Sequence, residues 1–165
     1  MSKPVESARG SKGSGATVVV DCVADILERE LQPLIEAWLL RVEKESDLSR
    51  IQLSHDERTG HLPYLIHDVI NRLRLDSGTK APISKAAADH GDLRCKQGYT
   101  VAMMVEESRL LQVSIFTTLY ENVTQLEFSA LLPDVVTIAD EVDAQLKEQM
   151  LRFIAADAAE KAKGK

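Results

Sequence analysis

Apolar residues recur at steps of three and four along most of the chain, which is the spacing of one helical face. Between residues 18 and 42 this stripe comprises Val23, Ile26, Leu27, Leu31, Leu34, Ile35, Trp38 and Val42. Pro33 interrupts the stripe, so the first helix is expected to kink or divide there. Ser54 and Glu57 have the spacing of a capping box and predict a second helix, whose first turns Gly60 and Pro63 make irregular.

Three more helices follow from the same pattern. A third is expected over 83–97, with Gly98 placed for a left-handed C-terminal cap. Thr100 is placed to cap a fourth, from Val101 to about Leu126, which is apolar around much of its circumference and is therefore expected at the centre. A fifth is expected to begin near Pro133, with the apolar stripe Val135, Ala139, Val142, Leu146 and Phe153.

No segment alternates as a strand does, so the predicted class is all-α. Five helices are compatible with an antiparallel five-helix bundle or with a globin-like arrangement without haem, and the sequence does not choose between them. Residues 1–16 are rich in Ser, Gly and Lys and predict a disordered leader, 17–157 one helical domain, and 158–165 a charged, solvated tail.

Composition narrows the classes of protein. With 165 residues and 44% hydrophobic content, the chain is long enough to bury a core without disulfides or metal. Its net charge of -6 argues against a nucleic-acid partner, because phosphate binding needs clustered Lys and Arg. The two cysteines, Cys22 and Cys95, give no disulfide framework, and no apolar run reaches the ~18 residues of a membrane span. We therefore expect a cytoplasmic protein that does not contact a membrane.

Motifs for catalysis or metal binding are weak. His55, His61 and His67 are spaced by six, so a single helix would distribute them around its axis and would not converge them on an ion. There is no phosphate-binding loop and no nucleophile elbow. We expect no metal, no cofactor and no enzymatic activity.

The densest group of hydrogen-bonding side chains lies at residues 90–109. His90, Arg94 and Gln97 fall at i, i+4 and i+7, on one face of the third helix. The turn at Gly98 and Tyr99 should bring the early part of the fourth helix, with Glu106, Glu107 and Arg109, alongside that face. This predicts a pairing of Arg94 with Glu107. The group either ties the two helices together or binds a partner, and both roles are compatible with the sequence.

The run H-G-x-x-R-x-x-Q-G-Y, formed by His90, Gly91, Arg94, Gln97, Gly98 and Tyr99 and followed by "EESRLL", resembles the signature of the RsbRD N-terminal domain family. The segment "HLPYLIHDVINRLR" resembles the L-P-x-L-L helix of that family, and the likeness covers roughly residues 22–155. Ser108 departs from it, since an aromatic is expected there in many relatives.

The resemblance implies a helical input domain of bacterial signal transduction and stress response. Such a domain dimerises and acts on a STAS protein, a serine kinase or a histidine kinase, and it is not itself an enzyme. The residues with a binding or regulatory role would be His90, Arg94, Gln97, Tyr99, Glu107 and Arg109.

Two alternatives stay open. "HDVINRL" resembles the phospho-accepting box of histidine kinases, so His67, or His90, is a candidate acceptor in a stand-alone phosphotransfer bundle. A globin-like sensor of haem or a small ligand is the other alternative, although Asp89 and Asp92 beside His90 do not suit a haem pocket.

The fifth helix also predicts the assembly. Besides its first apolar stripe it carries Val136, Ile138 and Ile154 on a second side, which a monomer would leave exposed. We expect a two-fold homodimer with Val135, Val142 and Leu146 in the contact.

Overall fold

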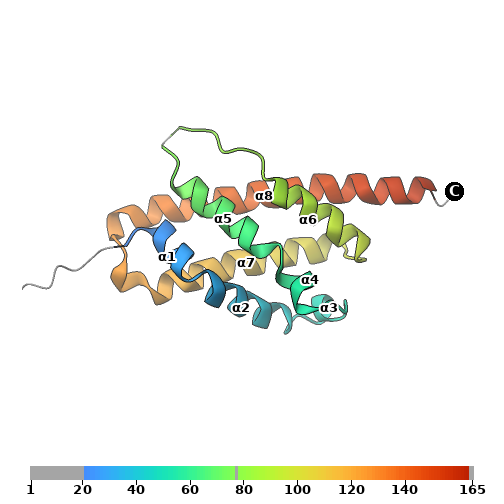
Figure 1. The fold of residues 1–165 in the computed structure, drawn as a ribbon, viewed down its shortest axis with the longest axis horizontal. Coiled ribbons are helices and arrows are strands. Elements are labelled where there is room, and N and C mark those ends of the chain that lie inside the picture. Colours follow the sequence, from blue (N-terminus) through green and yellow to red (C-terminus); the bar gives the residue numbers. More distant parts are fainter. Residues whose placement is uncertain (1–20, 77, 164–165) are drawn as a thin grey trace, which may run out of the picture.

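The computed structural model describes residues 21–76 and 78–163, and every element in this part of the chain is helical, as predicted (Figure 1). The elements are α1 (Val23–Arg29), α2 (Leu31–Val42), α3 (Ser46–Ser49), α4 (His55–Thr59), α5 (Leu62–Leu73), α6 (Lys85–Lys96), α7 (Val101–Glu121), the 3-10 turn η1 (Val123–Gln125) and α8 (Phe128–Lys163). The structure thus divides the chain more finely than the five expected helices. The expected leader, 1–16, lies outside the described residues.

The first expected helix divides at Glu30 and not at Pro33. Glu30 ends α1 and begins α2, and the amide of Leu34 donates to its carbonyl at 2.9 Å. Pro33 is the third residue of α2, where the amide has no partner within the helix in any case. Proline therefore costs little at this position, and the chain bends one turn earlier than predicted.

The capping box at Ser54 is confirmed, but the helix that it starts is short. The Glu57 amide donates to Ser54 Oγ at 3.3 Å, and the Ser54 amide donates to Glu57 Oε2 at 2.8 Å. α4 then ends at Thr59, and α5 begins anew at Leu62 with a proline in its first turn. His61 lies at this break, as the residue that precedes α5.

The predicted caps after α6 and before α7 are confirmed, whereas the predicted end of α7 and beginning of α8 are wrong. Gly98 has a φ of 79° after α6, and Thr100 Oγ1 accepts from the Met103 amide at 3.3 Å at the start of α7. α7 ends at Glu121, before the expected Leu126, and α8 begins at Phe128, before Pro133. Pro133 lies inside α8 close to its beginning, so only one hydrogen bond near a helix end is lost. Residues 158–163 of the expected tail are exposed and continue α8.

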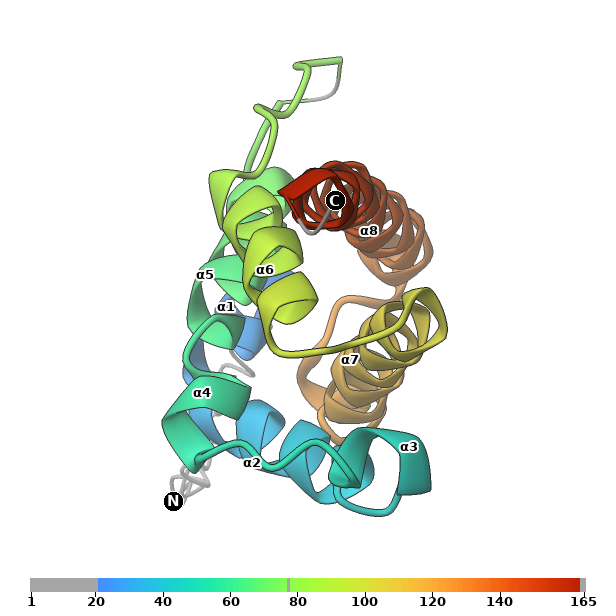
Figure 2. The same cartoon turned by 90° about the vertical axis from the view of Figure 1, so that its right-hand side faces the viewer.

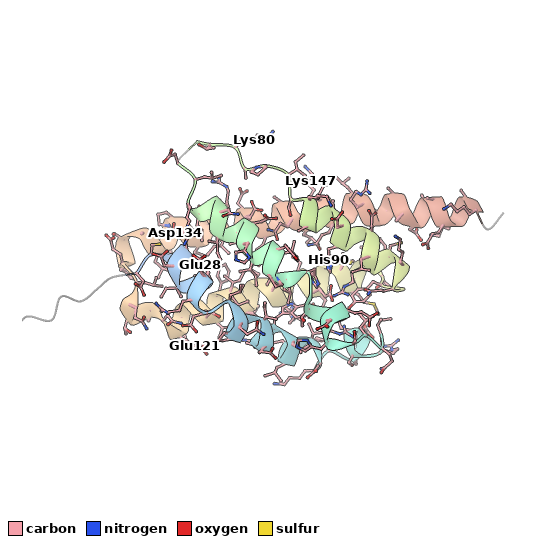
Figure 3. All side chains as sticks on the ribbon, viewed as in Figure 1. Glu28, Lys80, His90, Glu121, Asp134 and Lys147 are labelled. Atoms are coloured by element: carbon pink, nitrogen blue, oxygen red, sulfur yellow. The ribbon has the colours of Figure 1, made fainter. Side chains whose placement is uncertain are left out.

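α8 is the longest element and packs along α5, α6 and α7, while α2 packs on α7 (Figure 2). The connection that carries Lys80, between α5 and α6, stands away from these helices (Figure 3). α7 is not enclosed on all sides as expected, because Val101, Val105, Val113 and Tyr120 are exposed. Among the described residues, no helix is both long enough and apolar enough to cross a membrane.

The predicted dimer contact needs correction. Val142 is only 2% exposed and belongs to the core of the single chain, so it is not available to a second copy. Val135 and Leu146 are half-buried on the same side of α8. Ile138 is also buried, whereas Val136 is 68% and Ile154 57% exposed. The stripe that periodicity assigned to the dimer is therefore the one that covers the core.

Candidate functional site: a buried polar network beside a groove

Glu107 of α7 lies at the centre of a buried network of hydrogen bonds. Its carboxylate is 4% exposed and accepts from Arg94 Nε at 3.0 Å on Oε2, while Arg94 Nη2 forms an ion pair with Oε1 at 3.0 Å. The Tyr99 hydroxyl donates to Oε1 at 2.8 Å, and His90 Nε2 lies 3.2 Å from Oε2. The predicted pairing of Arg94 with Glu107 is confirmed. The contact joins α6 to α7 and includes the turn between them.

Arg94 extends this network to α4. Its side chain is fully buried, and it donates from Nη1 to the Glu57 carbonyl at 3.0 Å and from Nη2 to the Arg58 carbonyl at 3.0 Å. Gln97, the C-cap of α6, accepts from Nη1 at 2.7 Å and so holds the guanidinium from the other side. Every donor direction of Arg94 is therefore used, which is what a buried guanidinium requires.

Arg58 is a second buried guanidinium, which the sequence analysis missed. It donates to the Tyr99 hydroxyl at 2.9 Å and to the carbonyls of Leu48 and Ile51. Tyr99 thus accepts from Arg58 and donates to Glu107. Burial, first, and then the charge of Glu107 raise the pKa of the Tyr99 hydroxyl, so it stays protonated. The network now spans the α3–α4 region, α6 and α7.

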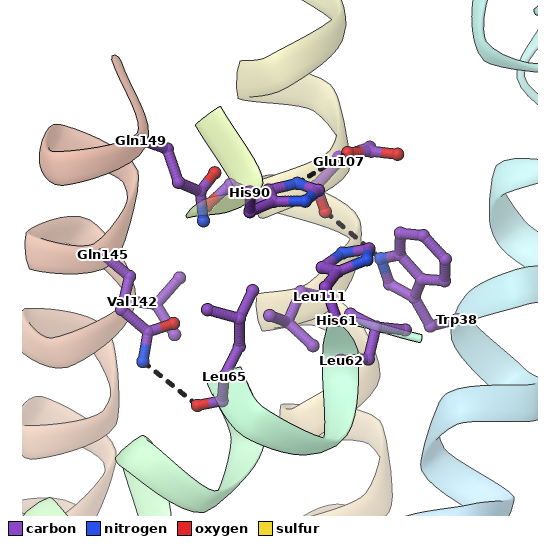
Figure 4. Close-up of a pocket in the computed structure, with 11 residues that line it drawn as sticks. Trp38, His61, Leu62, Leu65, His90, Glu107, Leu111, Val142, Gln145 and Gln149 are labelled. Atoms are coloured by element: carbon purple, nitrogen blue, oxygen red, sulfur yellow. Dashed lines mark hydrogen bonds and ion pairs between the residues drawn. The ribbon is translucent and has the colours of Figure 1, made fainter. Parts of the chain in front are cut away.

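His61 and His90 form a stacked pair beside this network (Figure 4). Their ring centroids are 3.8 Å apart with an angle of 15° between the planes, and Trp38 meets His61 edge-on at 6.0 Å. Because a carboxylate only accepts, the bond from His90 to Glu107 places the His90 proton on Nε2. Nδ1 of His90 consequently carries a lone pair.

A small chamber of about 10 Å³ lies on the inner side of the histidine pair. Three buried polar atoms in the described chain have no hydrogen-bond partner, and all belong to residues that line it: His61 Nδ1, His90 Nδ1 and Gln145 Oε1. Gln145 reaches it from α8 and donates to the Leu65 carbonyl at 3.1 Å (Figure 4). The volume and the polar atoms suit a single water molecule.

α6 approaches α8 closely at this chamber. A Cβ on Gly91 would lie 2.2 Å from the backbone oxygen of Gln149, so only glycine fits there. Gln149 is 5% exposed and, like Ser108 of α7, lines the chamber.

Burial sets the protonation of the network. Desolvation lowers the pKa of His61 well below its usual value and also lowers that of His90, although Glu107 partly offsets the second shift. Burial alone would raise the pKa of Glu107, but the hydrogen bond from His90 and the charge of Arg94 outweigh it and lower that pKa. At neutral pH the network therefore contains one carboxylate, two guanidinium groups and two neutral imidazoles.

His61, His90 and Glu107 are close enough to be considered as metal ligands, with candidate ligand atoms all within 4.8 Å of one another. The arrangement does not fit a cation. Each carboxylate oxygen is already in contact with two polar groups of the chain. The imidazoles are stacked, whereas two ligands of one ion would point toward it in their ring planes. A buried guanidinium beside the carboxylate would also repel the ion.

A groove of about 530 Å³ lies on the outer side of the histidine pair. It runs between α4–α5 and α6 and is lined by Asp56, Glu57, Gly60, His61, Tyr64, Lys85, Ala86, Asp89, His90 and Leu93. His61 and His90 line both the groove and the chamber, so the stacked rings form the wall between them. Spacing along one helix did not reveal this wall, because His90 belongs to α6 and His61 to the break before α5.

The remaining candidate residues lie apart from the network. Arg109 is an exposed residue of α7 that pairs with Glu106, so the structure does not bring it to Glu107. His67 is exposed on α5. His90, the other candidate phospho-acceptor, is 3% exposed and is not accessible to a partner in this conformation.

Comparisons of the chain with protein-family models, curated proteins and solved structures found no match.

Proposed function

We propose that this chain is a non-catalytic input module of bacterial signal transduction that acts by contact with a protein partner and works as a homodimer. The observation that carries the proposal is the network around Glu107, in which every charged group is bound by another group of the chain. A general base or nucleophile needs an accessible, reactive atom, and these side chains are buried and occupied.

Such a network can couple two parts of the molecule. It connects the groove side of the molecule, formed by α4, α5 and α6, with α7, which has an exposed apolar face. Buried polar networks lose much of their stabilisation when one bond is broken, so they favour two discrete arrangements over gradual deformation. A change at the histidine wall would reach α7 through Glu107.

Exposed apolar side chains support association through α7 and α8. Tyr120 is 78% exposed near the end of α7, and Phe128 and Leu132 are 76% and 68% exposed in the first turns of α8. Side chains of this size that remain exposed together mark contact sites. The family resemblance adds a STAS protein, serine kinase or histidine kinase as partner, a role in stress response and a globin-like arrangement. The two cysteines without a disulfide framework add a cytoplasmic location.

Light scattering of the whole chain tests the assembly. We expect a mass near twice the 18.2 kDa of one chain, and Leu132→Asp should reduce it to that of a monomer with unchanged helical circular dichroism. Leu40→Asp is the matched control, because Leu40 is also an exposed leucine, at 59%, but lies on α2. A monomeric mass for the unaltered chain would overturn the homodimer.

Phosphotransfer through His67 is the second candidate, and the exposure of this imidazole on α5 favours it over His90. Incubation with a small phosphodonor should then give acid-labile phosphate that His67→Ala abolishes and His90→Ala retains. Haem is not favoured, because His90 Nε2 is bound to Glu107 and the chamber of about 10 Å³ is far too small for a porphyrin. A small ligand would have to use the groove.

A further inference from the structure

We propose that the groove between α4–α5 and α6 binds a small organic cation with a flat apolar body, such as an arylamidinium or arylalkylammonium ion. This inference deepens the proposed regulatory function, because it names the chemical class of the signal. The binding itself does not require the chain to be a dimer.

The size and surface of the groove suit a small molecule. Its volume of about 530 Å³ falls within the range of ~300–1,000 Å³ that is usual for small-molecule sites. Gly60 and Ala86 contribute small residues to its lining, and Leu93, which also lines it, is 40% exposed. Tyr64, 66% exposed, offers a flat ring on which a planar body can stack.

The charges around the groove select a cation. Three acidic residues line it, Asp56, Glu57 and Asp89, against one lysine, Lys85, so three negative charges minus one positive leave an excess of two. The Glu57 carboxylate also accepts from the Ser54 amide in the capping box. Lys85 is itself paired with Asp89. The same tyrosine ring attracts a cation through its face.

The buried wall of the groove adds no positive charge. His90, which belongs to this wall, is 3% exposed, and burial lowers the pKa of its imidazole, so the ring is neutral. The guanidinium groups of Arg58 and Arg94 do not line the groove, since they face Glu107, Tyr99 and backbone carbonyls. A cation in the groove therefore meets a neutral imidazole at this wall and no buried cation.

Contact with this wall also explains how a ligand would be sensed. His90 is both a lining residue of the groove and a donor to Glu107. A positive charge held beside this ring polarises it and strengthens the N–H donor to Glu107. The ligand would thus act on Glu107, and through it on α7, without entering the chamber.

Titration of the whole chain with three probes of similar shape tests the proposal. Benzamidine supplies a flat cation, benzoate a flat anion and benzyl alcohol a neutral molecule. We expect the Kd of benzamidine to be about tenfold lower than that of the other two, the combined effect of one cation–π contact and the carboxylates. Amide chemical shifts of Tyr64, Ala86 and Leu93 should move during the titration, because these residues line the groove.

Matched variants locate the site. Tyr64→Ala should raise the Kd of benzamidine about fivefold, and Asp56→Asn about two- to threefold. Tyr120→Ala and Asp47→Asn are the controls, because Tyr120 is an exposed tyrosine of α7 and Asp47 an exposed aspartate of α3. Neither lines the groove, so neither should change the Kd.

Equal affinity for benzoate and benzamidine, absence of binding, or an equal effect of Tyr120→Ala and Tyr64→Ala would overturn the cation site. Light scattering on the same samples keeps this result separate from the proposed function. A dimer that binds no cation refutes only the cation site, whereas a monomer that binds benzamidine at the groove refutes only the homodimer.

Discussion

The interior of this protein has two parts that are held together in different ways. Around α1, α2 and the second half of α7, the core is mainly apolar, with Ile26, Leu27, Leu34 and Ile115 all fully buried, and its buried polar groups there are the small hydroxyls of Ser114 and Thr118. Around α4, α6 and the first half of α7, large buried side chains are charged or polar, and Arg94 is as fully buried as Trp38. Apolar burial stabilises without requiring a direction, whereas a buried ion pair stabilises only while all its partners are in place.

The comparison teaches which part can act as a switch. An apolar core tolerates small changes by repacking, and its response to a perturbation is gradual. In the polar part, a perturbation either breaks a bond to a charged group or leaves it intact. The structural response of this part is therefore closer to all-or-none. The groove lies against the polar part, through His61 and His90, and not against the apolar one.

Removal of the central carboxylate should have the largest effect. Glu107→Ala leaves the buried guanidinium of Arg94 without its charge partner, and we expect a loss of about 3–5 kcal/mol in the free energy of unfolding. Ile115→Val, in the apolar part of the same helix, should cost only about 0.5–1.5 kcal/mol. Urea unfolding followed by circular dichroism measures both. Equal losses would show that the two parts do not differ.

A double-mutant cycle tests whether the polar part acts as a unit. Arg94→Met and Glu107→Gln should each destabilise, while the double change should cost less than their sum, with a coupling energy of about 1–3 kcal/mol. In the apolar part, the cycle of Ile26→Val with Ile115→Val should be close to additive. Additive losses at Arg94 and Glu107 would contradict the contact.

The close approach of α6 and α8 gives a third test. Gly91→Ala forces α8 away from the chamber, because its Cβ meets the Gln149 backbone and not a flexible side chain. We expect a loss of about 1–3 kcal/mol and shifted NMR signals for Gln145 and Gln149. Ala24→Gly changes volume by the same amount in the apolar part and should leave those signals in place. Unchanged signals in Gly91→Ala would refute the close contact.

Acidification should lower the free energy of unfolding through the two histidines of the polar part. The pKa of His61 and that of His90 are lowered in the folded state, so the unfolded chain takes up protons first as pH falls below about 6.5. Stability that is fully present at higher pH is therefore lost on acidification, by at most about 1.4 kcal/mol per histidine for each pH unit. His61→Gln should reduce this slope between about pH 6.5 and 5.5. Leu34→Ala should lower stability equally at both pH values, and an unchanged slope in His61→Gln would contradict the assignment.

Local signals in the sequence predicted the parts that neighbouring residues determine. The caps at Ser54 and Thr100, the turn at Gly98 and the pairing of Arg94 with Glu107 follow from residues less than 15 positions apart. These features depend on short-range geometry, which spacing along the chain describes.

The rest of the site depends on contacts that no local pattern contains. His61 was placed on a continuous helix with His55 and His67, but the break before α5 separates the three and turns His61 toward His90. One signal for the chamber was present and was not used. Gln145 and Gln149 follow Val142 at steps of three and four, so they continue its core-facing stripe, and amides on such a stripe indicate a polar interior.

The bond between His90 and Glu107 has a further consequence for how this protein can be observed. A free neutral imidazole exchanges its proton between two nitrogens, but the carboxylate holds the proton of His90 on Nε2. The ring nitrogens of this residue therefore have distinct and fixed resonance positions in a nitrogen NMR spectrum as long as the network is intact. His90 therefore reports on the junction of groove, chamber and α7 through its own ring nitrogens, without an attached chemical probe.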